Sequence, residues 1–335
     1  MTRFDRDTAL SALEPNRFRV RIDPGWWITH GPNGGYVAAI LTRAVQEAVA
    51  DGSRRPRTLT IHYLSPLVEG DAEIEIQSER QGRTLTTVSA RLVQDGRPCA
   101  LALAALSSPR PPVDIGLETY PMPDVPSADE LPSNDPIALP FRRRLDTRYV
   151  PGFESFTEHS EAVLLAWMRL NEPRPLDIPE MALYADGMPP AVFALRSGDR
   201  PLGVPTVELT VHFYLDPSEA EVADDDFVLL RVASRTVRDN FTTEDTDIWS
   251  PGGRLLCHAR QVAALVEPRK DPASLEKRRA RRRHGKRRGP GPKRLSRGER
   301  RRKGWPRRRP GAFRVLRAAH ASGQNGRAGA PAGPS

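Results

Sequence analysis

An internal repeat constrains the fold of this 335-residue chain more than any other feature. Residues 59–63 (LTIHY) match residues 209–213 (LTVHF) at an interval of 150 residues, and the pair Gly96-Arg97 matches Gly253-Arg254 at 157. Each copy reads as a strand, a helix and an antiparallel meander, so two similar half-units are expected to pack side by side. The predicted fold class is α+β, with two tandem units that form a pseudo-dimer, each a sheet curved around one buried helix.

The first copy is organised around a glycine-rich loop and a helix at residues 31–50. Apolar residues recur at helical spacing from Val37 to Ala48, which predicts a helix packed on a sheet. The glycines leave its N-terminal N–H groups open to an anion or a polarised carbonyl, although they could equally serve only a turn. The predicted strands of this copy are 18–22, 57–65, 71–80, 83–94 and 97–107.

The second copy follows a segment at 109–151 that holds ten prolines and little periodicity. We interpret this segment as a linker or as an extended stretch lying over the surface. Pro189 and Pro190 disturb the helix predicted at 178–196. The predicted strands of this copy are 161–170, 204–215, 227–237, 241–250 and 254–266. The expected domains are 1–108, the linker 109–151, 152–267 and a tail at 268–335.

The tail differs from the rest of the chain in charge. Residues 268–335 hold 24 lysines and arginines against three acidic residues, which leaves 27 basic and 39 acidic residues in the body. Such a tail cannot bury a core and is expected to be disordered. It could make nonspecific contacts with nucleic acid or an acidic membrane surface. Its abrupt Arg/Gly/Pro/Ala composition also suits a shifted reading frame.

Neither a membrane span nor a secretion signal is expected. There is no apolar run of about 18 residues, and the N-terminus lacks an apolar core. Cys99 and Cys257 show no metal-ligand spacing, so a reduced cytoplasmic protein with inert thiols is expected.

Comparison of the two copies singles out a carboxylate, a hydroxyl and a carboxamide that occur only in the second. The paired positions are Asp186 with Asn33 or Gly34, Thr206 with Pro56, and Gln261 with Ala104. Each residue alone could be structural: Asp186 could cap a turn, and the other two could be ordinary strand residues. Their joint loss from one copy favours a duplicated enzyme that keeps a single catalytic site.

Five stretches, in this order and spacing, resemble the two-hotdog acyl-CoA thioesterases, the family of acyl-CoA thioesterase II. They are 31–39 (GPNGGYVAA), 59–66 (LTIHYLSP), 182–193 (ALYADGMPPAVF), 205–213 (PTVELTVHF) and 252–265 (GGRLLCHARQVAAL). The resemblance spans residues 15 to 267 and implies two tandem hotdog units with catalytic Asp186, Thr206 and Gln261. Because the segment HFYLDP is one residue longer than its family counterpart, Thr210 is the alternative threonine. The paired prolines depart from the family's longer second helix.

These groups suit thioester hydrolysis by an activated water. Asp186 can accept a proton from the water or orient it, and the hydroxyl of Thr206 and the carboxamide of Gln261 can hold it. The first helix would supply donors for the substrate carbonyl, as an oxyanion hole does. Substrate binding is expected at Asn33, Gly34 and Gly35, with Asn33 touching only the glycine loop.

Other chemistries fit less well. The sequence has no G-x-S-x-G elbow, no phosphate-binding GxxxxGK[ST] and no dinucleotide fingerprint. His62 and His212 occupy the same place in both copies, which favours strand packing over catalysis. No cofactor or metal is expected. The expected partner is an acyl-CoA substrate, and self-association into a homo-oligomer stays open. The alternative is a non-catalytic hotdog module that binds an acyl ligand and uses its basic tail to contact nucleic acid or anionic surfaces.

Overall fold

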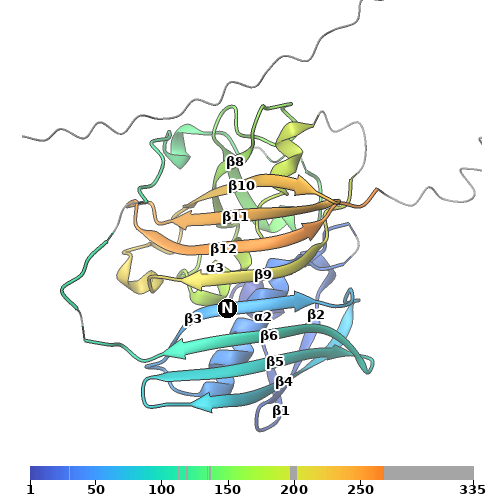
Figure 1. Ribbon diagram of the computed structural model, residues 1–335, viewed down its shortest axis with the longest axis vertical. Helices are drawn as coiled ribbons and strands as arrows, with labels where there is room; N and C mark the ends of the chain where they lie inside the picture. The colour runs from blue at the N-terminus through green and yellow to red at the C-terminus, as the bar shows by residue number, and fades with distance from the viewer. Residues whose placement is uncertain are drawn as a thin grey trace, which may run out of the picture. The chain divides into compact units, whose positions relative to one another are not determined.

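The computed structural model describes residues 1–29, 31–111, 113–117, 120–133, 135, 137–196 and 202–267. The basic tail expected at 268–335 lies outside these residues. Within them, twelve antiparallel strands form one sheet, in the order β1-β2-β4-β5-β6-β3-β9-β12-β11-β10-β8-β7 (Figure 1). The strands of the first half are β1 (Ser11–Glu14), β2 (Arg17–Ile22), β3 (Arg55–Tyr63), β4 (Gly70–Gln81), β5 (Leu85–Gln94) and β6 (Arg97–Ser107). Those of the second are β7 (Leu145–Tyr149), β8 (Ala162–Leu170), β9 (Thr206–Phe213), β10 (Val228–Arg238), β11 (Phe241–Trp249) and β12 (Leu255–Ala264).

The two halves of the sheet meet at the pairing of β3 with β9. Thr60 lies directly opposite Thr210, which is its own partner in the sequence repeat, and their hydroxyl oxygens are 3.0 Å apart. From this seam outward, each strand of the first half has its counterpart at the mirrored position of the second. The prediction of two tandem units of one fold is confirmed.

Helix α2 (Gly34–Val49) is the buried helix of the first half. Asn33 caps it by accepting a hydrogen bond from the backbone N–H of Tyr36, at 3.1 Å. Its side chains from Tyr36 to Thr42 are all buried. Both α2 and α3 (Ile178–Tyr184) lie behind the sheet in the view of Figure 1. The first half therefore has the predicted arrangement of a sheet around a helix.

The helix predicted at 178–196 is wrong in its length. Helix α3 ends at Tyr184, and after a turn a short 3-10 helix, η4 (Ala191–Leu195), follows. Pro189 and Pro190 lie between them, where proline removes a backbone donor and disfavours helical geometry in the residue before it. As a consequence Asp186 lies in the turn after a helix and not within one.

The proline-rich segment is more than a linker. Its residues around Met122, Val125 and Leu131 pack on Trp167 and Trp249 in a small second apolar cluster. Its final residues, expected to be part of a linker over 109–151, form β7 at the edge of the sheet and the 3-10 helix η3 (Arg142–Arg144). Leu145, Thr147 and Tyr149 of β7 are buried, an alternation typical of a strand with one covered face. The remaining 3-10 helices are η1 (Pro24–Trp26), η2 (Ala128–Glu130) and η5 (Pro217–Glu219).

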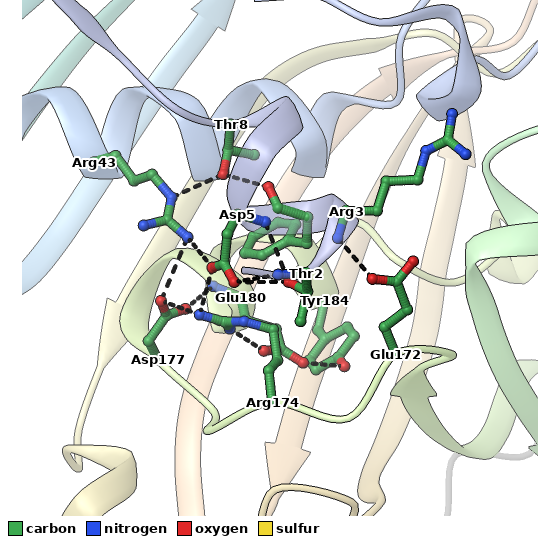
Figure 2. A network of polar contacts seen from close by, with 11 residues as sticks. Thr2, Arg3, Asp5, Thr8, Arg43, Glu172, Arg174, Asp177, Glu180 and Tyr184 are labelled. Carbon is green, nitrogen blue, oxygen red and sulfur yellow. Dashed lines mark hydrogen bonds and ion pairs between the residues drawn. The ribbon is translucent and has the colours of Figure 1, made fainter.

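An ionic network joins the first residues of the chain to both central helices (Figure 2). The carboxylate of Asp5, in helix α1 (Arg3–Asp7), forms an ion pair with Arg43 of α2 at 3.2 Å. It forms a second one at 3.1 Å with Arg174, which precedes α3. Arg174 also binds Asp177, the N-cap of α3, at 2.7 Å, and the buried Glu180. The network fixes α2 and α3 relative to each other, and therefore fixes the turn that carries Asp186.

Both cysteines, Cys99 and Cys257, are free and buried. Burial raises the pKa of the Cys257 thiol, which keeps it protonated and unreactive. Among the described helices, none is long and apolar enough to cross a bilayer.

Candidate active site

Gln261 of β12 lies at the centre of a buried polar cluster in the second half. Its carboxamide oxygen accepts a hydrogen bond from the Thr206 hydroxyl of β9, at 2.7 Å. Its carboxamide nitrogen donates to Oε1 of Glu244 on the neighbouring strand β11, also at 2.7 Å. Strand register explains these contacts, because Gln261 pairs directly with Glu244. Three adjacent strands thus bring a hydroxyl, a carboxamide and a carboxyl together.

Asp186 joins this cluster from the turn after α3, at the N-terminus of α2. The side-chain nitrogen of Asn33 donates to the backbone carbonyl oxygen of Asp186 at 2.9 Å and to the carboxylate Oδ2 of Asp186 at 3.2 Å. Gln261 and the backbones of Gly34 and Gly35 also interact with the carboxylate and favour its ionised form. Both halves of the chain therefore supply polar partners, and the second half supplies the carboxylate.

Glycine at positions 34 and 35 permits this close approach. A Cβ at Gly34 would lie 2.7 Å from Oδ2 of Asp186, and one at Gly35 would overlap the backbone carbonyl of Leu183 in α3. Real Cβ atoms do not approach other atoms so closely. Helix α2 can therefore direct its N-terminal donors at Asp186 only because these two residues have no side chain.

Two residues of this cluster were absent from the sequence prediction. Tyr63 of β3 donates its hydroxyl to the carbonyl of Gly34 at 2.8 Å, and a Cβ at Gly34 would lie 3.1 Å from that hydroxyl. Glu244, only 3% exposed, is the second. The repeat pairs Tyr63 with Phe213, so the comparison that found Gln261 could also have found Tyr63. Glu244 lies opposite Gln261 as Val88 lies opposite Ala104, so its counterpart is known only from strand register.

Burial raises the pKa of both carboxyls. The pKa of Asp186 rises to about 6, chiefly through desolvation, while the hydrogen bonds from Gln261, Gly35, Gly34 and Asn33 oppose the rise. The pKa of Glu244 rises to about 7 for the same main reason, and the nearby charge of Asp186 adds to it. At neutral pH Asp186 is thus mostly ionised, with a basicity well above that of an ordinary aspartate.

The members of the cluster differ in exposure. Gln261 is 6% exposed and Glu244 is 3% exposed. Asp186, Thr206, Tyr63 and Gly34 are half-buried.

The structure distinguishes Thr206 from Thr210, the alternative threonine. The hydroxyl of Thr210 contacts Thr60 and Glu208, not Gln261. Strand register also agrees with the pairing of Thr206 with Pro56. Thr206 lies opposite Ala263 on β12, and Pro56 lies opposite Leu106 on β6. These two partners correspond, because each lies two residues after a paired position, Gln261 or Ala104. Thr206 is therefore the threonine beside the carboxamide.

One expectation about the glycine loop needs correction. Asn33 does not touch only the loop, since it bonds directly to Asp186. The backbones of Gly34 and Gly35 lower the pKa of the Asp186 carboxyl, as the positive end of a helix does for a nearby anion. Their expected contact with a substrate carbonyl stays a prediction.

Arg142 fixes the turn that holds Asp186. This side chain is 5% exposed, pairs with Asp135, and donates to the carbonyl of Gly187 and to the hydroxyl of Thr147 at 3.1 Å. A buried guanidinium with these partners restrains the backbone next to the catalytic candidate. No group of three or more His, Cys, Asp or Glu side chains suited to a metal occurs among the described residues.

Comparison with known proteins gives two matches to family profiles. Residues 23–107 match the acyl-CoA thioesterase N-terminal domain, and residues 118–265 match the acyl-CoA thioesterase C-terminal domain. A curated relative, the thioesterase-like protein TwmA of Talaromyces wortmannii, is 30% identical over 95 residues, which is 28% of this chain and 27% of the relative. The match thus spans about a quarter of that relative's length.

Solved structures resemble the chain over most of its length. A conserved hotdog-fold protein of unknown function from Alicyclobacillus acidocaldarius is 27% identical, with a TM-score of 0.70 over 80% of this chain and 99% of the other. A candidate thioesterase II from Thermobifida fusca is 28% identical, with a TM-score of 0.67 over 80% and 98%. An acyl-CoA thioesterase II from Mycobacterium marinum, at 19% identity and a TM-score of 0.63 over 79% and 99%, shares the fold.

Proposed function

Because this chain belongs to the acyl-CoA thioesterase family, we propose that it hydrolyses acyl-CoA to a free acid and coenzyme A at the Asp186 cluster. The main support for this proposal is that Asp186, Thr206 and Gln261 lie together beside the N-terminus of α2. The carboxylate of Asp186 also has a raised basicity. These are the three residues singled out by comparing the two copies of the repeat.

In the proposed reaction Asp186 acts as general base. Its carboxylate accepts a proton from a water held by Thr206 as the water oxygen attacks the thioester carbon. The tetrahedral intermediate then collapses, the carbon–sulfur bond breaks, and the thiolate leaves with the electron pair. The proton on Asp186 passes to the thiolate or to solvent. Once Asp186 is neutral, the Gly34 and Gly35 donors are available to the negative charge on the substrate oxygen.

The direct test is a panel of acyl-CoA substrates of different chain lengths, with release of free thiol as the readout. We expect turnover of at least one member, with the rate proportional to enzyme. Binding of acyl-CoA without thiol release would support the non-catalytic binding module instead.

We expect kcat/KM to rise with pH through a midpoint at about 6. The base must be ionised to accept a proton, so activity is low below the pKa of Asp186 and reaches a plateau above it. Initial rates at substrate concentrations well below KM, between pH 4.5 and 8.5, measure this profile. A rate that falls over this range as the pH rises would mean that an acid, and not Asp186 as base, limits the reaction.

Thr206→Val is expected to lower kcat about tenfold, because valine has a similar shape but cannot hold a water. Thr210→Val is the matched control, since its hydroxyl contacts Thr60 and Glu208. We expect Thr210→Val to hydrolyse acyl-CoA at the parent rate. The reverse ranking of the two variants would assign the site to Thr210.

A further inference from the structure

Glu244 is the one carboxyl of the cluster to which the proposed mechanism gives no role. Its Oε1 accepts from the side-chain nitrogen of Gln261 at 2.7 Å, and its Oε2 accepts from the backbone N–H of Ala191 at 2.5 Å. The hydroxyl of Ser234 lies 3.3 Å from Oε2. A carboxyl that is 3% exposed and surrounded by donors has a fixed position, and isolating it from water costs free energy that an apolar residue would not.

We propose that Glu244 is a positioning residue, which holds the carboxamide of Gln261 with its nitrogen toward the carboxyl groups and its oxygen toward Thr206. This inference rests on the proposed function, and it adds a residue that acts through Gln261. Glu244 lies opposite Gln261 on the neighbouring strand β11 and is only 3% exposed.

The need for such a residue follows from the symmetry of a carboxamide. Rotation by half a turn exchanges its oxygen and its nitrogen at almost no intrinsic cost, so its neighbours decide the orientation. Thr206 cannot decide it, because a hydroxyl donates or accepts equally well. Asp186 favours the nitrogen only while it is ionised, and it takes up a proton during each turnover. Glu244 takes no part in that proton transfer. Its ionised form only accepts hydrogen bonds, so it can keep the orientation above its pKa of about 7.

Glu244 also interacts with Asp186 through charge. The charge of Asp186 raises the pKa of Glu244, because a nearby like charge disfavours the ionised form. The other groups around the pair are Asn33, Gly34 and Gly35 of the first half, Tyr63 with Glu208 near it, Ala191 from η4 and Ser234 from β10. Removing the charge of Asp186 should therefore lower the pKa of Glu244.

Glu244→Gln tests the proposal, because it keeps the size of the side chain and removes its charge. We expect kcat to fall about tenfold with KM within about twofold, as for a misplaced catalytic group. The acidic limb of the kcat/KM profile should stay in place, because Glu244 has the higher pKa and is mostly neutral where Asp186 titrates. In a Gln261→Ala background, Glu244→Gln should cause no further loss, because Glu244 would act through a side chain that is no longer there.

Ser234→Ala is the matched control. It removes another contact of Glu244 without touching Gln261, and should leave both kcat and the limb unchanged. If Glu244→Gln does not fold, Glu244→Asp is the second variant. Aspartate keeps the charge but is shorter, which moves the carboxylate away from Gln261. It should lower kcat while the acidic limb of the pH profile stays in place. Parent kcat in Glu244→Gln, or an equal loss with and without Gln261, would overturn the proposal.

A readout independent of turnover separates this inference from the proposed function. Carboxyl-carbon NMR of protein labelled at glutamate gives the pKa of Glu244 directly, whether or not acyl-CoA is hydrolysed. A lower pKa of Glu244 in Asp186→Asn supports the interaction between the two carboxyls, and an unchanged pKa overturns it. Absence of hydrolysis by the parent would count against the function alone.

Discussion

Replacing Asp186 with asparagine is expected to slow acyl-CoA hydrolysis by two or more orders of magnitude. Asparagine has nearly the same shape and can still accept from the α2 donors, but it cannot take a proton from water. Gln261→Ala should cost less, because Asp186 and Thr206 can still hold the water. Steady-state thiol release measures both variants, and circular dichroism checks that each remains folded.

Asp247→Asn is the matched control for this prediction. Asp247 is also a buried carboxyl of the second half, on β11, but it binds His258 at 2.7 Å and Tyr120 at 3.0 Å instead of Gln261. Its replacement should leave the rate within about twofold of the parent. If folded Asp186→Asn hydrolysed acyl-CoA at the parent rate, the assigned site would be wrong.

Replacing Gly35 with alanine is expected to lower the free energy of unfolding by about 1–3 kcal/mol, because it overpacks a close backbone contact. The added Cβ would overlap the carbonyl of Leu183, which belongs to the backbone of α3 and cannot rotate away. A loss of stability would be informative, because helix propensity alone favours alanine over glycine by about 1 kcal/mol and would stabilise the variant. Urea denaturation at neutral pH measures the change.

Gly34→Ala should act on catalysis more than on stability. Its Cβ would meet the Asp186 carboxylate, a side chain that can move, so we expect the rate to fall by about tenfold or more. Gly52→Ala is the control for both glycines, because nothing lies within 4 Å of a Cβ at that position. A stability of Gly35→Ala equal to that of Gly52→Ala would contradict the contact between α2 and α3.

Much of the fold could be predicted because the repeat shows the same order of strands and helix twice. The strands of both meanders and helix α2 lie within a few residues of their predicted bounds. The second helix was predicted too long because its apolar residues continue past Pro189 and Pro190 into η4. Strand β7 was missed because five residues among prolines give little periodicity, although its buried face alternates as a strand should. Tertiary contacts decide both segments.

The candidate site was predictable only in part, for a different reason. Asp186, Thr206 and Gln261 stand out because their counterparts lack the polar group. Glu244 and Tyr63 differ from their counterparts in the same way, but the Glu244 pairing needs strand register, which the sequence alone does not supply. Nothing in the sequence marks Arg142 as buried, because its partners Asp135 and Gly187 come together only in the folded chain.

The seam between β3 and β9 has a thermodynamic consequence. Asp186 and Glu244 both have a raised pKa in the folded protein, so the stability they contribute is complete below about pH 4 and is lost as the pH rises through about 6 and 7. At alkaline pH each raised pKa corresponds to a cost of about 3 kcal/mol. Two identical subunits meeting at such a seam would carry this cost at two places. A single continuous chain can have Val88 and Ala104 at the second place, so it carries one pair of buried carboxyls and has apolar core at the corresponding positions of the other half.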